Sequence, residues 1–279
     1  MKKLFVLGGL LAVATNSHAL VVITVSDGNV LAGNIAGSGV TIDSASINYI
    51  GANTQGGVFT GGIASGIGIE SGILLTTGDA SAAVGPNSSG VTSTTVGTAG
   101  DTGLSAQIGG VSTNDANVLE FNFTTSTGDL FFDFVFASDE YNEFLNFNDP
   151  FGLFVDGVNY ALAPDGQIVS VGSVNCGTTG TDTGPNCSSF NNNTTTNAFN
   201  IEYDGFTDVF TASVLGLGAG SHTMKFAIAD AGDDSIDSAV FIKAGSFSGV
   251  NPTNNVPEPA SLALLSLGLL GFSISRKQK

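Results

Sequence analysis

Apolar and polar side chains alternate with a period of two in several stretches of the chain. The pattern is clearest at residues 119–124, 132–136 and 223–228, where every second position is Phe, Leu, Met or Ile. Successive side chains of a β-strand point to opposite faces of a sheet, so this period is typical of a strand with one buried face. The alternation therefore predicts a fold built from sheets.

Turn signals and composition extend this prediction to residues 20–250. Asp156-Gly157 separates two short apolar runs, which is typical of a hairpin with a type I′ turn. No window of a dozen residues before position 260 shows a helical stripe. The 20 Phe residues, without any Trp, suit a core between two sheets, because Phe carries no polar group that needs a buried partner. We predict an all-β fold, a single jelly-roll-like β-sandwich domain.

The N-terminal residues 1–19 differ from this domain. Lys2 and Lys3 precede the short apolar run Leu4–Ala14, and Ser17-His18-Ala19 has the small-x-small pattern of a cleavage site. This order predicts a secretory signal peptide that is cleaved after Ala19.

The C-terminal residues also differ. A polar linker, residues 251–255, leads to the segment 256–279, in which residues 260–275 carry no charge. As a helix these would reach roughly 24 Å at about 1.5 Å per residue. A hydrocarbon core is about 30 Å thick, and flanking basic side chains can make up the difference. The basic cluster Arg276, Lys277 and Lys279 predicts a cytoplasmic end, so we expect an inner-membrane anchor.

The order of motifs in residues 256–279 resembles a known sorting signal. Pro257, Glu258 and Pro259 come first, then the apolar span and the basic tail. This order is similar to the PEP-CTERM protein-sorting signal of Gram-negative bacteria. The resemblance implies cleavage near Pro257-Glu258-Pro259 by a membrane-embedded exosortase, and onward passage to the outer surface or the exopolysaccharide matrix. A permanent C-terminal anchor is the alternative.

Several long motifs in the domain resemble a second family. They are the residues 71–78, 134–144, 147–157 and 222–247, among them Phe134-Val-Phe-Ala-Ser-Asp-Glu-Tyr-Asn-Glu-Phe144. Together they are similar to the choice-of-anchor L domain, over roughly residues 57–248. The resemblance implies a bacterial surface protein with one of several C-terminal anchors, of which a PEP-CTERM tail is one. It implies a location and a fold rather than a settled activity.

The charge of the chain excludes some functions. The formal net charge is −17, and Lys225 and Lys243 are the only basic residues between positions 20 and 255, apart from His222. Such a surface repels phosphate backbones, so we expect no nucleic-acid binding.

Two segments rich in small polar residues, 80–115 and 172–199, predict long loops. The second contains Cys176 and Cys187. Because the chain is expected to be exported, the two cysteines predict a disulfide that closes this loop.

Two acidic stretches predict calcium as a cofactor. Carboxylate and amide oxygens are the ligands that Ca²⁺ prefers. The first stretch carries Asp230, Asp233, Asp234 and Asp237 between two predicted strands, and the second carries Asp139, Glu140, Asn148 and Asp149 after another strand. If both stretches lie at the same end of the sandwich, they can converge on one ion. A solvated acidic turn is the alternative.

Catalysis has little support in the sequence. His18 leaves with the signal peptide, so a Ser-His-Asp triad would have to use His222, which more simply faces solvent at a strand end. Clustered carboxylates from Asp139 to Glu143 leave open a glycan-active hydrolase. Asn200, Tyr203 and Asp204 could form a sugar-binding set, although a turn followed by a strand explains them as well.

These observations predict an exported, non-catalytic protein of the cell surface or extracellular matrix. We expect processing by an exosortase, transient insertion in the inner membrane, a structural or adhesive role that involves exopolysaccharide, and stabilisation by calcium. A secreted glycan hydrolase is the alternative.

Overall fold

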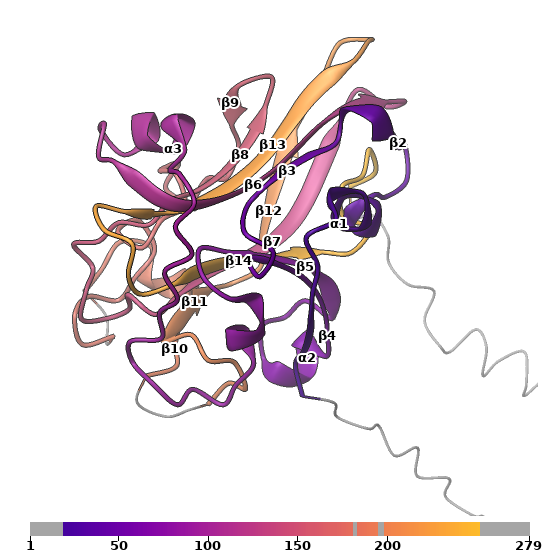
Figure 1. Cartoon of the computed structure of the whole chain (residues 1–279). Helices are drawn as coiled ribbons and strands as arrows, with labels where there is room; N and C mark the ends of the chain where they lie inside the picture. Colours follow the sequence, from indigo (N-terminus) through magenta and orange to yellow (C-terminus); the bar gives the residue numbers. More distant parts are fainter. Residues whose placement is uncertain (1–18, 181–182, 195–197, 252–279) are drawn as a thin grey trace, which may run out of the picture.

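The computed structural model describes residues 19–180, 183–194 and 198–251. Across them, two antiparallel sheets face each other (Figure 1). The larger sheet runs β1 (Val21–Thr24), β4 (Gly56–Thr60), β5 (Ser71–Thr76), β14 (Ser238–Lys243), β7 (Leu130–Ser138), β11 (Gly205–Thr207) and β10 (Phe190–Asn192), with β12 (Phe210–Val214) also paired to β7. The smaller sheet runs β2 (Val40–Ile42), β6 (Thr113–Thr125), β13 (His222–Ala231), β8 (Phe151–Val155) and β9 (Val158–Asn159), with β3 (Asn48–Ile50) paired to β6. The predicted all-β sandwich is confirmed.

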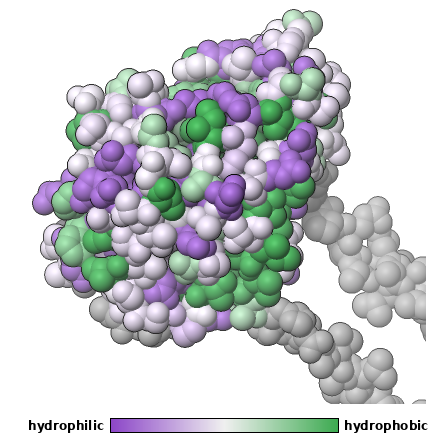
Figure 2. Space-filling model, in the orientation of Figure 1, coloured by the Kyte–Doolittle hydropathy of each residue, from purple (hydrophilic) through white to green (hydrophobic). Residues whose placement is uncertain are grey.

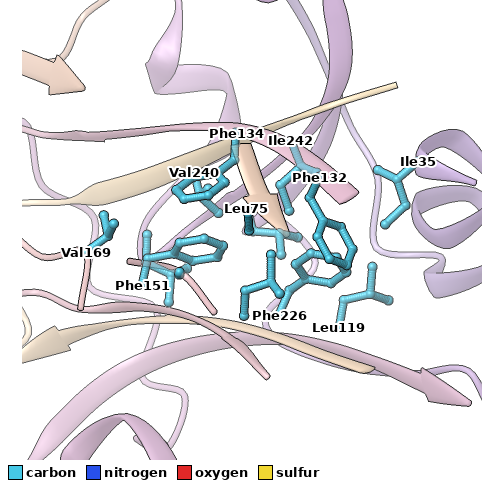
Figure 3. Close-up of a cluster of buried hydrophobic side chains, with 14 of the residues drawn as sticks. Ile35, Leu75, Leu119, Phe132, Phe134, Phe151, Val169, Phe226, Val240 and Ile242 are labelled. Atoms are coloured by element: carbon cyan, nitrogen blue, oxygen red, sulfur yellow. The ribbon is translucent and has the colours of Figure 1, made fainter. Parts of the chain in front are cut away.

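Aromatic side chains fill the space between the sheets (Figure 3). Phe132 of β7 meets Phe226 of β13 with ring centroids 5.7 Å apart, and Phe134 meets Phe151 of β8 at 5.2 Å. All four rings are buried. Tilted and edge-to-face pairs of this kind are favoured by the charge distribution of the rings. The alternating Phe residues of the sequence are therefore the main core.

The central strand β7 is buried on both faces, which the alternation does not predict. Its even-numbered Phe residues face the main core, whereas Val135 and Ala137 belong to a second apolar cluster with Tyr203 and Phe206. The prediction of one buried face is wrong for this strand, because the chain leading into β11 packs against its other face.

Short helices lie in the connections. They are α1 (Gly28–Ile35), α2 (Gly62–Ser65) and α3 (Thr102–Gln107), with 3₁₀ turns η1 (Ser44–Ser46), η2 (Ala80–Ala83) and η3 (Cys187–Ser189). The sequence shows no helical stripe a dozen residues long, and α1 is too short to produce one because it has only eight residues. The Asp27 side chain caps this helix by accepting from the amide of Asn29 at 2.9 Å, and Leu31 and Ile35 bury one face.

Two local predictions agree with the structure. Asp156 and Gly157 both have positive φ, 49° and 82°, so the β8–β9 hairpin turn is of type I′ as the sequence predicts. Cys176 and Cys187 form a disulfide, with Cα atoms 4.6 Å apart. The bridge closes the loop ahead of β10.

Strand β7 connects the two ends of the sandwich. At its start, the amide of Phe131 donates to the carbonyl oxygen of Ser248 at 2.8 Å, so the last described residues lie here. At its other end, the chain continues into Asp139. Phe131 and Asp139 are eight positions apart along the chain, and at about 3.3 Å per residue this separates the two ends by roughly 26 Å. We name the first the apolar end, because Phe247 is buried there, and the second the acidic end.

The surface and the termini add two observations. Figure 2 shows apolar side chains gathered over β4 and α2. Val21 and Ile23 of β1, which pairs with β4, are 48% and 62% exposed, and Ile63 of α2 is 62% exposed. In the described part of the chain, no helix is long and apolar enough to cross a membrane. The segment 256–279 and nearly all of the predicted signal peptide lie outside that part; Ala19, which is described, is exposed.

Candidate metal centre

Acidic side chains from six segments meet at the acidic end. Paired antiparallel strands place the end of one beside the start of the next. Ser138 of β7 pairs with Ser238 of β14, and Ala231 of β13 pairs with Thr113 of β6. The buried acids here are Asp115, Asp139, Glu140, Asp149, Glu202, Asp204, Asp230 and Asp237. The two acidic stretches of the sequence therefore lie at the same end of the sandwich.

Asp149 is fully hydrogen-bonded. Its Oδ1 accepts from the amide of Ala231 at 2.8 Å, and its Oδ2 accepts from the hydroxyl of Ser238 at 2.6 Å. These bonds join the start of β8 to the end of β13 and the start of β14. Glu140 is equally buried, but its Oε2 has no hydrogen-bond partner.

Asp230 and Asp237 hold oxygens without partners. Both carboxylate oxygens of Asp230 and the Oδ2 of Asp237 lack a donor, although the two side chains are only 1% and 2% exposed. The hydroxyl of Thr77 donates to the carbonyl oxygen of Ser238 at 3.4 Å, and it also lies near enough to Asp230 to lower the pKa of that carboxyl. The Asp237 carboxylate lies against Gly78, where any Cβ would collide with it. Buried polar atoms are rarely left without partners, so these oxygens point to a missing one.

A second group of acids lies beside the first. The Oδ1 of Asp139 accepts from the amide of Asp204 at 3.1 Å, while the Oδ2 atoms of both residues have no partner. Glu202 accepts from the Ser88 hydroxyl and amide, and from the Thr92 hydroxyl at 2.9 Å. Neutral donors thus hold this group in place without balancing its charge.

No basic side chain neutralises these acids in the described residues. The ion pairs there join His222 to Asp156, and the two lysines to Asp101 and Asp133. None of these pairs includes one of the buried acids of the acidic end. Burying ionised carboxylates without a counterion is costly, so the acids must hold protons or a cation.

Burial raises the pKa values accordingly. Burial is the main reason that the pKa of Glu140 is raised to about 9 and that of Asp149 to about 8. It likewise raises the pKa of Asp230 to about 10, to which the charge of Asp149 contributes, and that of Asp237 to about 7. Burial, followed by the charges of Asp204 and Glu202, raises the pKa of Asp139 well above its ordinary range. Without a cation, these groups therefore hold their protons to a higher pH than exposed carboxyls do.

Comparison with known families identifies both parts of the chain. The family model of the choice-of-anchor L domain matches residues 21–248. The chain belongs to this family. The model of the PEP-CTERM protein-sorting motif matches residues 255–277. No curated protein and no solved structure matches the chain.

These matches confirm the two resemblances and establish the export route in outline. A PEP-CTERM motif indicates export, a transient membrane anchor, processing by an exosortase-type enzyme and display at the surface of a Gram-negative bacterium. Together the two matches support an exported surface protein.

Three predicted calcium ligands are not among the buried acids, although the charge of Asp233 still raises the pKa values of Glu140 and Asp149. Asp234 is exposed and Asp233 is half-buried, with its Oδ1 accepting from the amide of Ser235. The Oδ1 of Asn148 accepts from the amide of Gly172 at 2.6 Å. Within the described ranges, no three acidic, His or Cys side chains are grouped closely enough to hold a metal ion by themselves. An ion here would also need hydroxyl, carbonyl or water oxygens.

Sequence reasoning missed three members of the acidic end, and the reason is their separation along the chain. Asp115 lies in β6, and Glu202 and Asp204 precede β11. No local cluster marks them. One signal could have found them: acids recur at the ends of several predicted strands, and antiparallel pairing brings such ends together.

The catalytic and sugar-binding alternatives do not gain from the geometry. Asp139 and Glu140 are 0% and 1% exposed, so neither carboxyl reaches the surface where a glycan would bind. His222 contacts Asp156 and the carbonyl oxygen of Gly218. The ring of Tyr203 is buried, and its hydroxyl lies 3.4 Å from that of Thr76.

Proposed function

We propose that this choice-of-anchor L protein is a non-catalytic module of the cell surface or extracellular matrix whose acidic end binds Ca²⁺. The observation that carries the proposal is the set of buried carboxylates with unpartnered oxygens and no basic neighbour. Calcium suits such a site, because it takes six to eight oxygen ligands in flexible geometry.

The ion lies between Asp230 and Asp237. Together these residues offer three unpartnered oxygens, and the charge of Asp237 raises the pKa of Asp230. Asp149 adds negative charge next to Asp230 but keeps its own oxygens bonded to Ala231 and Ser238. Backbone carbonyls and water complete the shell, so three clustered carboxylates are not required.

The position of the site suits a displayed module. Ser248, after which the chain runs toward the sorting motif, lies at the apolar end, whereas Asp230 and Asp237 lie at the opposite one. While the C-terminal segment is anchored, the acidic end therefore faces away from the membrane. Calcium outside the cell then stabilises the acidic end, which is the part of the domain farthest from the anchor.

Association with exopolysaccharide is supported by a groove on the outer face of the smaller sheet. It has a volume of about 650 Å³ and lies beside α3, with Glu120, Asn122, Thr223, Lys225 and Phe154 among its lining residues. Amide, hydroxyl and charged groups around an aromatic ring can bond a sugar, and the volume is typical of ligand sites. Replacing Asn122 and Thr223 together by Ala should reduce co-sedimentation of the protein with purified exopolysaccharide. Unchanged co-sedimentation would reject this groove as the binding site.

Thermal unfolding in calcium and in chelator tests the calcium site. At free calcium about 100 times the Kd, binding contributes about 2.7 kcal/mol. This corresponds to a rise of about 5–10 °C in Tm for a domain of this size. The Asp230→Asn protein should lose this rise, since the amide removes the charge that the ion neutralises.

The matched control is Asp234→Asn, on the same acidic stretch but exposed. It should keep the full calcium response. Equal Tm values of the wild type in millimolar calcium and in chelator would refute the proposed site, as would an Asp230→Asn protein that responds like the wild type.

A further inference from the structure

An irregular segment, residues 86–98, crosses the acidic end, and we name it the strap. Residues 86–98 form no strand, so they lack the regular hydrogen bonds of a sheet. Val91 is 55% exposed, so apolar burial also holds the segment only weakly. Instead, its polar groups bond to carboxylates. The amides of Thr94 and Val96 donate to Asp237 at 3.0 Å and Asp115 at 2.9 Å.

The first half of the strap covers the second group of acids. The side-chain amide of Asn87 donates to the Oδ1 of Asp204 at 2.5 Å, and Ser88 and Thr92 donate to Glu202. A Cβ added at Gly90 would lie 3.2 Å from the Oδ2 of Asp204, so the strap passes close to that unpartnered oxygen.

Two unpartnered oxygens in this group point to a ligand. Asp139 and Asp204 are 0% and 2% exposed, and each has one oxygen held by a neutral donor and one without a partner. The backbone amide of Asp204 donates to the carboxylate of Asp139, and the charge of Asp204 raises the pKa of Asp139, so the two side chains lie close together. Glu202 adds a third charge nearby, although strap hydroxyls already bond its oxygens.

We propose that a second Ca²⁺ binds between Asp139 and Asp204, under the strap, and fastens the strap to the domain. The proposal rests on the calcium function above but uses different carboxylates. The free oxygens of Asp139 and Asp204 are two ligands, and oxygens of the strap and water supply others. Binding requires both carboxyls to be ionised, so calcium displaces their protons and turns mutual repulsion into attraction to one cation.

The fastened strap has a consequence for the displayed end. Because the strap bonds to Asp237 as well as to Glu202 and Asp204, the ion between Asp139 and Asp204 also orders one wall of the first site. In calcium the strap is closed over both groups of acids, and without calcium it opens more often than the sheets beneath it.

Calorimetric titration of the exported protein with calcium counts the sites. We expect two ions per chain for the wild type, and one each for Asp204→Asn and Asp230→Asn. Asp139→Asn is a second test of the same site and should also bind one ion, while exposed Asp234→Asn should bind two.

Hydrogen exchange of residues 86–98 tests the strap itself. Calcium should slow exchange at least tenfold in the wild type and in Asp230→Asn, but not in Asp204→Asn. One bound ion in both the wild type and Asp204→Asn would overturn the second site while leaving the first intact. No bound calcium in the wild type would refute both proposals. Equal hydrogen-exchange rates of residues 86–98 with and without calcium would refute the fastening of the strap.

Discussion

The two ends of the sandwich are completed in different ways. At the apolar end, Phe247 inserts between the sheets, with its ring centroid 5.0 Å from that of Phe123 and 5.1 Å from that of Phe132. At the acidic end, Asp230 and Asp237 are buried instead, and they hold carboxylate oxygens without a hydrogen-bond partner. Side chains alone satisfy the first end. The second requires protons or a cation, so its stability depends on the medium.

The largest expected effect concerns the apolar end. Phe247→Ala removes a fully buried ring and should reduce the free energy of unfolding by about 3–5 kcal/mol. The loss should be the same in calcium and in chelator, because no charged group takes part. Chemical denaturation in both media measures it.

A matched control is Leu215→Ala, since this apolar side chain is 69% exposed and should change stability by less than about 0.5 kcal/mol. A Phe247→Ala loss that shrinks when calcium is added would contradict the independence of the two ends.

The pH dependence should distinguish the ends with a smaller effect. Burial raises the pKa of Asp149 to about 8, of Asp237 to about 7 and of Asp204 to about 6, all above their value of about 4 in the unfolded chain. In this range the folded chain holds more protons than the unfolded chain, so stability is complete below about pH 4 and falls as pH rises through these folded values.

Thermal unfolding in chelator between pH 5 and 9 should therefore show a falling Tm, and calcium should flatten the slope by replacing the protons. A Tm in chelator that rises with pH over this range would mean that the buried carboxylates are ionised and otherwise compensated.

The smallest expected effect concerns an ion pair at the apolar end. The hydrogen bond from His222 to Asp156, 2.7 Å long, raises the pKa of His222. The stability that this pair contributes is present below the unfolded value of about 6.5 and is lost as pH rises through the folded one. Since the Asp156 side chain is 48% exposed, the contribution should stay below about 1 kcal/mol.

Titration of the His222 ring by NMR checks this prediction. Asp156→Asn should lower the pKa of His222 toward its ordinary value and leave the calcium response unchanged. A calcium response that changes with this substitution would show that the ends are coupled.

Local sequence was sufficient for several features. The period of two at residues 119–124 and 223–228 predicted paired strands β6 and β13, and Asp156-Gly157 predicted the hairpin turn. The long motifs predicted the choice-of-anchor L family, and the tail predicted the sorting motif. Each of these depends on neighbouring residues in one segment, which a sequence displays directly.

Other features depended on which segments meet in space. Nothing in residues 132–136 indicates that the chain before β11 covers the second face of β7. The acids Asp115 and Glu202 are separated by 87 positions from one another, yet both lie at the acidic end.

The sequence by itself determined that this chain forms sheets with an aromatic core, is exported, and carries more negative charge than it can pair. Only the tertiary structure decided that the unpaired charge is buried at one end, under the strap and opposite the exit of the C-terminal segment. The physical reason is that antiparallel pairing brings alternate strand ends together whatever their distance along the chain, and burial then raises the cost of each unpaired carboxylate.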